Sequence, residues 1–445
     1  MANRPKPINP ARAMAVGFMG LIFIGSLLLY LPSSRLADDF SYIDALFTAA
    51  SAVCVTGLVV VDTGTFFTPL GQIIIMLLIF TGSLGSMTMT SLVFIFLGRR
   101  ISLRRNLIVK EILGQDSMEN LSTLIINVAL MTFLFVSVGT ALLSLRFVPA
   151  YGSSKGFLFA LFHAVSAFGN AGFDLFGHYE SLTQFPTDYL VNGTIMFLFI
   201  IGGLGFTVIL EIANRFQFRH RLSLHSYLVL IITAILLFGG AILVLAFEYN
   251  NHATMGSLTV PGKIFTAFFT AATPRTAGFN VLDTGALFNS TLLVLLALMF
   301  IGASPTSTGG GVKTTTFAVV MITFISMIRG RHEPVVYFRR FPLYQIMRAV
   351  SIMSAAVALI FVTTLMLTIF ENRDFLSLLF EAFSAFGTVG LSTGITPDLC
   401  SSSKGVLILT MFGGRVGPLS LLVALAGRKK SEGELRYPEE NLMIG

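Results

Sequence analysis

The sequence has few charged residues, no tryptophan and only two cysteines. Of its 445 residues, 11% are charged and 54% are hydrophobic, whereas charged residues make up about a quarter of a typical soluble domain. A soluble fold of this composition would lack the polar surface that water requires. The cysteines, Cys54 and Cys400, are too few for a disulfide framework and have no metal-ligand spacing. These shortages favour an integral membrane protein.

Support for an enzyme is also weak. The sequence contains no His-Glu-x-x-His zinc motif. Residues 304–313 resemble a nucleotide-binding P-loop, but Val312 separates Gly311 from Lys313, and no soluble strand precedes the stretch. We therefore expect neither catalysis nor ATP binding by this chain.

Long apolar runs predict eight membrane spans, since a helix needs about 20 apolar residues to cross the hydrocarbon core. Four runs are continuous and four are interrupted by glycine. The continuous runs are 13–32, 121–145, 226–247 and 349–370, and the interrupted runs are 70–97, 188–212, 291–327 and 405–426. Basic residues precede the first run, so a cleaved signal peptide is an alternative there, although no small-residue cleavage site follows.

The distribution of basic residues predicts that both termini are cytoplasmic. Five segments hold 20 of the 29 Lys and Arg residues, whereas the other connecting segments hold 13 of the 22 acidic residues. Cytoplasmic loops carry such a basic excess, so the chain is expected to be a multi-pass protein of the cell membrane. Its basic charge is a topology signal and predicts no nucleic-acid partner. The predicted cytoplasmic segments are 1–12, 98–120, 213–225, 328–348 and 427–445.

A short motif that ends in glycine occurs four times. The copies read ALFTAASAVCVTGL at 45–58, ALFHAVSAFGNAGF at 160–173, AFFTAATPRTAGF at 267–279 and LLFEAFSAFGTVGL at 378–391. Their glycines, Gly57, Gly172, Gly278 and Gly390, lie 115, 106 and 112 residues apart. The first and third copies also share Asp-Thr-Gly, at Asp62 and Asp283.

Each motif is too short to cross a membrane and lies between two spans. A span, a half-membrane helix, an extended loop and a second span form a re-entrant pore unit, in which non-helical backbone is buried or lines water. We therefore predict an all-α integral membrane fold of four tandem span–pore helix–span repeats with pseudo-fourfold symmetry around one pore. The predicted repeats are 13–97, 121–212, 226–327 and 349–426.

The four glycines suit a cation filter. A permeating cation exchanges its water for rings of backbone carbonyl oxygens, and glycine lets the backbone aim those carbonyls inward. The C-terminal dipole of each half-helix adds negative potential. The alternative is that the glycines are helix-packing sites, as in Gly-xxx-Gly contacts. Four copies at similar spacing favour the filter, with the cation bound at Gly57, Gly172, Gly278 and Gly390.

The loops VTGL, NAGF, TAGF and TVGL closely resemble the filters of the Trk/Ktr/HKT superfamily of potassium transporters, as does TPRTAGFN at 273–280. The eight-span length is most similar to the bacterial Ktr membrane subunit, of the KtrB/KtrD type. Glycine rather than serine in the first loop favours potassium over sodium. The resemblance implies a filter of Val55, Thr56, Gly57, Asn170, Ala171, Gly172, Thr276, Ala277, Gly278, Thr388, Val389 and Gly390.

The second span of the third repeat is interrupted by a polar, glycine-rich stretch. The resemblance implies that this stretch, 303–312, is an intramembrane gating loop beneath the filter. The resemblance also places Arg415 beside this stretch, where it would narrow the cation path. A charge at membrane depth is a functional candidate, and a snorkelling or buried structural arginine is the alternative. Arg275 is expected to brace the third loop, against a carboxylate such as Glu381. The predicted gate residues are Ser304, Pro305, Thr306, Ser307, Thr308, Gly309, Gly310, Gly311, Lys313 and Arg415.

The expected function is channel-like potassium uptake with sodium dependence, so sodium is a second candidate ion. The resemblance implies a homodimer and a cytosolic nucleotide-binding regulatory ring of the KtrA/KtrC type that gates the pore. A secondary transporter with inverted repeats is the main rival. It is disfavoured because each repeat has two spans and therefore restarts on the same side.

Overall fold

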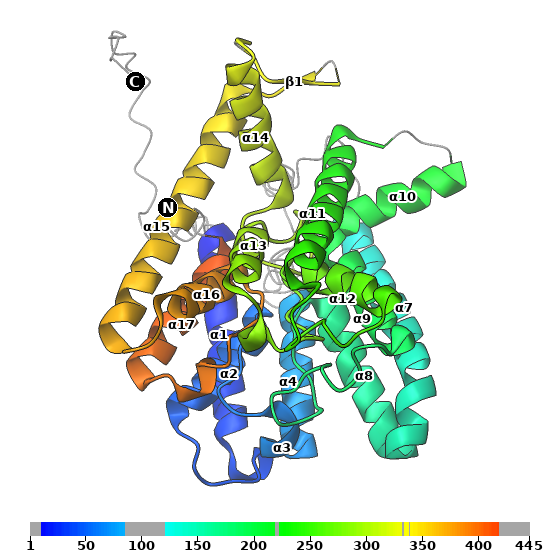
Figure 1. The fold of residues 1–445 in the computed structure, drawn as a ribbon, viewed down its shortest axis with the longest axis vertical. Helices are drawn as coiled ribbons and strands as arrows, with labels where there is room; N and C mark the ends of the chain where they lie inside the picture. Colours follow the sequence, from blue (N-terminus) through cyan, green and yellow to red (C-terminus); the bar gives the residue numbers. More distant parts are fainter. Residues whose placement is uncertain (1–9, 85–120, 219–221, 332, 338, 418–445) are drawn as a thin grey trace, which may run out of the picture.

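The computed structural model describes residues 10–84, 121–218, 222–331, 333–337 and 339–417, and these are almost entirely helical (Figure 1). Their elements follow the chain in four groups. The first group is α1 (Pro10–Tyr30), η1 (Pro32–Ser34), α2 (Tyr42–Cys54), α3 (Thr63–Phe66) and α4 (Pro69–Ser83). The second group is α7 (Leu121–Tyr151), α8 (Ser153–Gly169), α9 (Tyr189–Leu204) and α10 (Phe206–Phe218).

The third and fourth groups repeat this plan with local additions. The third is α11 (Leu224–Glu248), α12 (Val260–Ala272), η2 (Thr284–Ala286), α13 (Asn289–Phe300) and α14 (Thr314–Ile328). The fourth is β1 (Val335–Val336), β2 (Arg339–Arg340), α15 (Leu343–Phe370), α16 (Phe375–Gly387), η3 (Thr396–Asp398) and α17 (Ser401–Val416). Strands β1 and β2 pair antiparallel, a small exception to the predicted all-α fold.

Short helices form the core, and long helices form its surround. The phenylalanine that recurs in each motif lies in α2, α8, α12 or α16 and is at most 1% exposed; these residues are Phe47, Phe162, Phe269 and Phe380. In contrast, the long helices present apolar side chains outward, such as Phe133 at 74% and Phe361 at 66% exposed. Since the exposed face is apolar, it suits lipid rather than water.

Three long helices match three of the four predicted continuous spans, and the shorter apolar helix α1 lies at the fourth, 13–32. Among the described residues, three helices are long and apolar enough to cross a membrane: Ile126–Tyr151, Leu224–Glu248 and Leu343–Phe370. Helices α9 and α10 together form a bent pair that could count as a fourth span. The predicted spans 70–97 and 405–426 begin with α4 and α17, but their later parts lie outside the described residues.

Two spans are broken rather than merely kinked. Helices α9 and α10 meet at 98°, at Gly205, whose φ of 94° no helix accommodates. Helix α10 then continues to Phe218, into the segment 213–225 that we expected to be a loop. Helices α13 and α14 are separated by residues 301–313, where Ile301 and Val312 form a parallel bridge.

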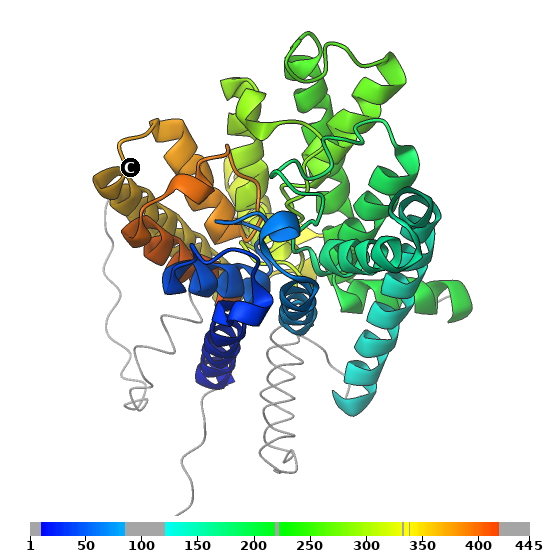
Figure 2. The same ribbon diagram turned by 90° about the horizontal axis from the view of Figure 1, so that it is seen from below.

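The four groups pack in cyclic order around a common centre, as the view from below shows (Figure 2). The second apolar helix of each group contacts the short helix of the next: α4 packs on α8, α9 on α12, α13 on α16, and α17 on α2. Because the last contact returns to the first group, the arrangement is closed. The ends of the four short helices meet inside this ring.

Candidate functional site

The four motif glycines lie in one ring of backbone. Each has a positive φ, of 93°, 68°, 79° and 93° in chain order. A Cβ added at any of them would collide with a backbone carbonyl oxygen of the neighbouring loop, which belongs to the residue just before the motif glycine of that loop. The contacts run from Gly57 to Ala171, from Gly172 to Ala277, from Gly278 to Val389, and from Gly390 back to Thr56. Any side chain at these positions would therefore separate two neighbouring loops.

The residue that begins each loop is also left-handed, which the sequence analysis missed. Val55, Asn170, Thr276 and Thr388 have φ values of 58°, 60°, 73° and 51°. The sequence pattern points to unusual backbone freedom at the glycines alone. Val55, Asn170 and Thr388 are the C-caps of their short helices. The backbone N–H of each donates hydrogen bonds to carbonyls of the last helical turn.

Hydroxyl groups from the short helices fix the loops. Ser51 Oγ accepts a hydrogen bond from Gly57 N at 3.0 Å, and Ser384 Oγ accepts one from Gly390 N at 3.1 Å. In the other two repeats the hydroxyl donates instead, Ser166 to Phe173 O at 2.7 Å and Thr273 to the carbonyl of residue 279 at 2.6 Å. The sequence holds the signal, because every motif has Ser or Thr five or six residues before its glycine.

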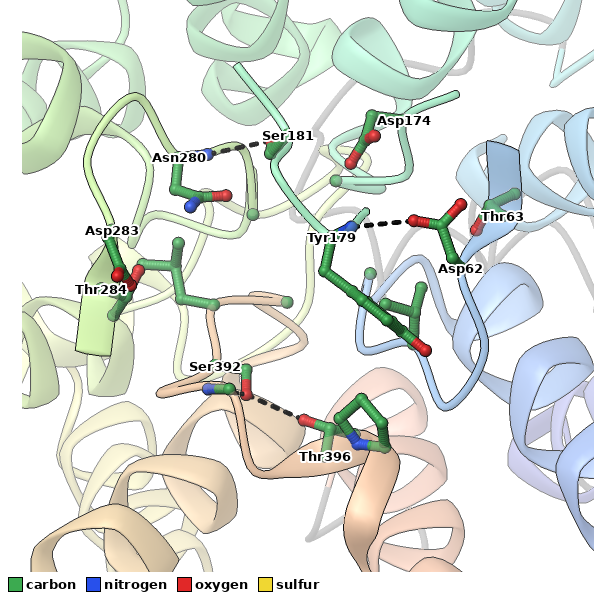
Figure 3. A pocket seen from close by; sticks show the side chains of 18 of the residues that line it. Asp62, Thr63, Asp174, Tyr179, Ser181, Asn280, Asp283, Thr284, Ser392 and Thr396 are labelled. Carbon is green, nitrogen blue, oxygen red and sulfur yellow. Dashed lines mark hydrogen bonds between the residues drawn. The ribbon is translucent and has the colours of Figure 1, made fainter. Parts of the chain in front are cut away.

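A cavity of about 360 Å³ lies against the glycine ring (Figure 3). Each repeat contributes one aspartate to its lining, and among the described residues no lysine or arginine lines it. These aspartates are Asp62, Asp174, Asp283 and Asp398. Burial, together with the nearby charge of Asp62, raises the pKa of the Asp174 carboxyl to about 7. Four carboxyl groups therefore surround the cavity, and burial favours the protonated form of the Asp174 carboxyl.

The predicted gate residues lie against the other side of the loops. Gly310 N donates to Thr388 Oγ1 at 3.0 Å, and Gly309 abuts Thr276 so closely that a Cβ would collide with its side chain. The Asn170 amide lies 3.0 Å from Thr276 Oγ1. The side chains that begin loops three and four thus contact the stretch that interrupts the third repeat, and the side chain that begins loop two contacts Thr276.

This stretch is held by the break between α9 and α10. Ser304 N donates to Gly203 O at 3.0 Å and Thr308 N donates to Gly202 O at 3.2 Å. In return, Phe206 N donates to Thr306 O at 3.1 Å. Backbone bonds therefore hold the stretch to the second repeat at several points.

Two basic side chains bind the same stretch. Lys313 Nζ donates to Gly309 O at 2.7 Å. The Arg415 guanidinium donates through Nη1 to Thr308 O and through Nη2 to Gly82 O, so it joins repeats one, three and four. The structure thus brings Arg415 next to the predicted gating stretch.

The expected pairing of Arg275 with Glu381 is not formed. Glu381 accepts hydrogen bonds from Ser392 Oγ at 2.5 Å and from Thr396 Oγ1 at 2.9 Å, and the ion pairs of the described ranges do not include it. Arg275 is 8% exposed, and its Nε has no hydrogen-bond partner among the described residues.

Residues 390–394, GLSTG, fit the Gly-x-Ser-x-Gly spacing of hydrolases. Here Ser392 Oγ donates a hydrogen bond to Glu381, and no strand–turn–helix arrangement surrounds the serine in the described structure.

Comparisons with known proteins agree with this geometry. A family model described as TrkH cation transport protein matches residues 9–433. The chain is 42% identical over 437 residues to the Ktr system potassium uptake protein B of Bacillus subtilis, covering 98% of this chain and 97% of that protein. It is 37% identical over 446 residues to the potassium/sodium uptake protein NtpJ of Enterococcus hirae, covering 99% and 98%.

The fold has a solved counterpart as well. The crystal structure of the potassium transporter TrkH from Vibrio parahaemolyticus aligns with a TM-score of 0.71 at 20% identity, over 96% of this chain and 86% of that one. The resemblance inferred from the glycine loops is confirmed, as is the expectation that the chain is not an enzyme. The chain belongs to the TrkH family of cation transport proteins and is a multi-pass membrane transporter.

Proposed function

We propose that this protein takes up potassium ions across the cell membrane through one pore per chain. The observation that carries the proposal is the closed ring of four glycine loops, in which each glycine faces the carbonyl of a neighbouring loop. The printed names of two relatives, which specify potassium uptake and potassium/sodium uptake, support the choice of ion.

The loop residues act through their backbone. Carbonyl oxygens of the four loops replace the water shell of the ion, with potassium at Gly57, Gly172, Gly278 and Gly390. The short helices end at the loops, so their C-terminal dipoles add negative potential. On the mouth side the four aspartates attract cations. The proposed filter comprises Val55, Thr56, Gly57, Asn170, Ala171, Gly172, Thr276, Ala277, Gly278, Thr388, Val389 and Gly390.

The proposed gate is the stretch from Ser304 to Gly311, together with Lys313 and Arg415. It touches Thr276 and Thr388 of the filter loops, so an ion that leaves the filter meets it next. Moving it requires the bonds to Gly202 and the contacts of Arg415 to be exchanged, which gives the gate two distinct arrangements rather than a continuous range.

Regulation and assembly are proposed from the family resemblance. We propose a homodimer whose cytoplasmic surface binds a nucleotide-binding ring of the KtrA/KtrC type. The ring would bind on the inner segments, with both termini cytoplasmic. The repeat boundaries 13–97, 121–212, 226–327 and 349–426 follow from the same proposal, as does sodium dependence.

The test is uptake of rubidium, a potassium substitute, into right-side-out membrane vesicles with and without sodium. Vesicles containing the protein should accumulate rubidium in competition with potassium. Expression should also restore growth of a potassium-uptake-deficient bacterium at low potassium. A protein that reaches the membrane yet gives neither rubidium uptake nor growth would contradict the proposal. Equal rates with and without sodium would remove the sodium dependence alone.

A further inference from the structure

A short segment of the second repeat crosses the mouth of the proposed pore. Residues 177–182, which we call the strap, are bonded to the repeats on either side. Tyr179 N donates to Asp62 Oδ2 of the first repeat at 2.8 Å. Leu182 N donates to Asn280 O of the third repeat at 3.0 Å, and Asn280 N donates back to Ser181 Oγ at 3.3 Å. The strap, which belongs to the second repeat, therefore links the first repeat to the third.

The backbone of the strap is strained. Three of its non-glycine residues, His178, Tyr179 and Ser181, have φ values of 57°, 57° and 49°. Residues other than glycine rarely adopt this left-handed backbone conformation. Several such residues close together persist only where surrounding contacts enforce the conformation. The bonds to Asp62 and Asn280 are such contacts. They fix the direction in which Tyr179 points.

The Tyr179 side chain extends over the cavity that adjoins the glycine ring. Figure 3 shows its ring leaving the strap and passing between the first (blue) and fourth (orange) repeats. It lines the cavity of about 360 Å³ together with all four motif glycines, while 48% of the residue remains exposed to solvent. Tyr179 thus lies between the outside and the filter.

The electrostatic surroundings of Tyr179 agree with this position. Burial raises the pKa of its hydroxyl, and the charges of Asp62 and Asp398 raise it further. Asp398 belongs to the fourth repeat, so the hydroxyl is close enough to respond to the far side of the mouth. The side chain is therefore neutral at physiological pH, so any effect it has on cation entry comes from its bulk.

We propose that Tyr179 determines which cations enter: held over the mouth by Asp62, its ring admits potassium and excludes larger organic cations. This inference rests on the proposed pore function. Without the ring, the cavity and its aspartates are open to a bulky monovalent cation, which would bind there and block the filter. Tetraethylammonium is a suitable probe because it carries one positive charge and cannot shed its bulk.

The repeated Asp-Thr-Gly sequence provides a matched control. Asp62 Oδ1 accepts from Thr65 N and Thr65 Oγ1, both at 2.8 Å, which leaves Oδ2 for Tyr179. Asp283 Oδ1 accepts from Gly285 N at 2.9 Å, and Asp283 has no bond to the strap. Asparagine is a good helix cap, so Asp62→Asn preserves the turn and loses the acceptor for the strap. Asp283→Asn removes the same charge from the same cavity and leaves the strap in place.

The experiment measures rubidium uptake into right-side-out vesicles at increasing external tetraethylammonium. Tyr179→Ala should be blocked at a concentration at least about ten-fold lower than the parent, which corresponds to ~1.4 kcal/mol. Tyr179→Phe, which keeps the ring, should match the parent. Asp62→Asn should shift toward Tyr179→Ala, whereas Asp283→Asn, which removes the same charge without releasing the strap, should show no shift toward Tyr179→Ala.

Three results would overturn the inference. They are equal sensitivity of Tyr179→Ala and the parent, stronger block of the parent than of Tyr179→Ala, and equal shifts for Asp62→Asn and Asp283→Asn. The second would make the ring a binding face, and the third would make mouth charge the cause. Absence of rubidium uptake by the parent would instead contradict the proposed function on which the inference rests.

Discussion

At the scale of residues, the motif glycines combine a left-handed backbone with the absence of a side chain. Gly57 has φ of 93° and faces Ala171 O. A substitution there is unfavourable twice, because an L-residue rarely adopts that φ and its Cβ would collide with the adjacent loop. Both effects act on the position of a carbonyl that we assign to the filter.

We predict that Gly57→Ser lowers the potassium-over-sodium selectivity ratio by about ten-fold or more, since a shift of ~1.4 kcal/mol in relative ion binding is sufficient. The measurement is rubidium uptake in competition with potassium or sodium. Gly405→Ser is the matched control, because no atom lies within 4 Å of a Cβ at Gly405. An unchanged ratio in a folded Gly57→Ser protein would remove Gly57 from the filter.

Asp174 is the second residue with a distinct expectation, since its pKa is raised to about 7 by burial and by Asp62. The raised pKa means that the fold favours the protonated carboxyl. The mouth accordingly gains negative charge as pH rises through 7 and loses it as pH falls. This change lies in the range where transport is measured.

We predict that the potassium concentration for half-maximal uptake rises about two- to ten-fold from pH 8 to pH 6, because a mouth of lower charge attracts cations less. Asp174→Asn should show the high value at both pH values and little pH dependence. Asp283→Asn keeps Asp174 and should retain the dependence. A pH profile that is the same in the parent and in Asp174→Asn would show that another group titrates.

At the scale of elements, the stretch between α13 and α14 is bonded to the broken second repeat and to Arg415. A helix through residues 301–313 is prevented by Pro305 and three successive glycines. The extended backbone exposes carbonyls, and two of them, Thr308 O and Gly309 O, are bound by Arg415 and Lys313. Two basic side chains therefore flank the stretch, which contacts the loops that we assign to the filter.

We predict that Arg415→Gln raises rubidium uptake several-fold with little change in selectivity. Even at an effective dielectric of about 20, two like charges some 4 Å apart repel by about 4 kcal/mol, and the filter carbonyls are untouched. Arg415→Lys keeps the charge and should stay near the parental rate. Removal of residues 308–311 should also raise uptake. Parental rates for both Gln and the deletion, in proteins that reach the membrane, would place the gate elsewhere.

At the scale of the whole molecule, the ring of repeats closes where α17 meets α2. Lys404 Nζ lies 2.7 Å from Asp44 Oδ1, and the two side chains are 12% and 15% exposed. Asp44 also takes part in the capping box at the start of α2. The pair thus joins the fourth repeat to the first pore-side helix.

We predict that Lys404→Met lowers the free energy of unfolding by about 1–3 kcal/mol, because it leaves a largely buried carboxylate without its partner. Thermal unfolding in detergent is the measurement. Arg340→Met is the control, since its pair with Glu333 is 72% and 58% exposed and such pairs contribute about 1 kcal/mol or less. Equal stability losses for the two variants would show that Lys404 has no special role in closing the ring.

The sequence by itself determined the repeat and the positions of its glycines. Apolar run lengths predicted the long helices α7, α11 and α15, and four glycines at similar spacing predicted the loops, because the side-chain-free positions must recur wherever the backbone approach recurs. The buried phenylalanines were predictable for the same reason, as each sits at the same place in its motif. These features depend on local pattern and on repetition, which the chain carries without its fold.

Only the tertiary structure decided which groups meet. Nothing local distinguishes Asp62 from Asp283 within their shared Asp-Thr-Gly, yet Asp62 alone of the two holds the strap, because the second repeat reaches it. Val55 and Thr388 have a left-handed backbone that such residues rarely adopt, and neighbouring residues enforce this conformation. Glu381 binds Ser392 rather than Arg275, since a buried carboxylate takes the nearest donors in space. Partner choice between repeats is a property of the closed ring, and no single segment encodes it.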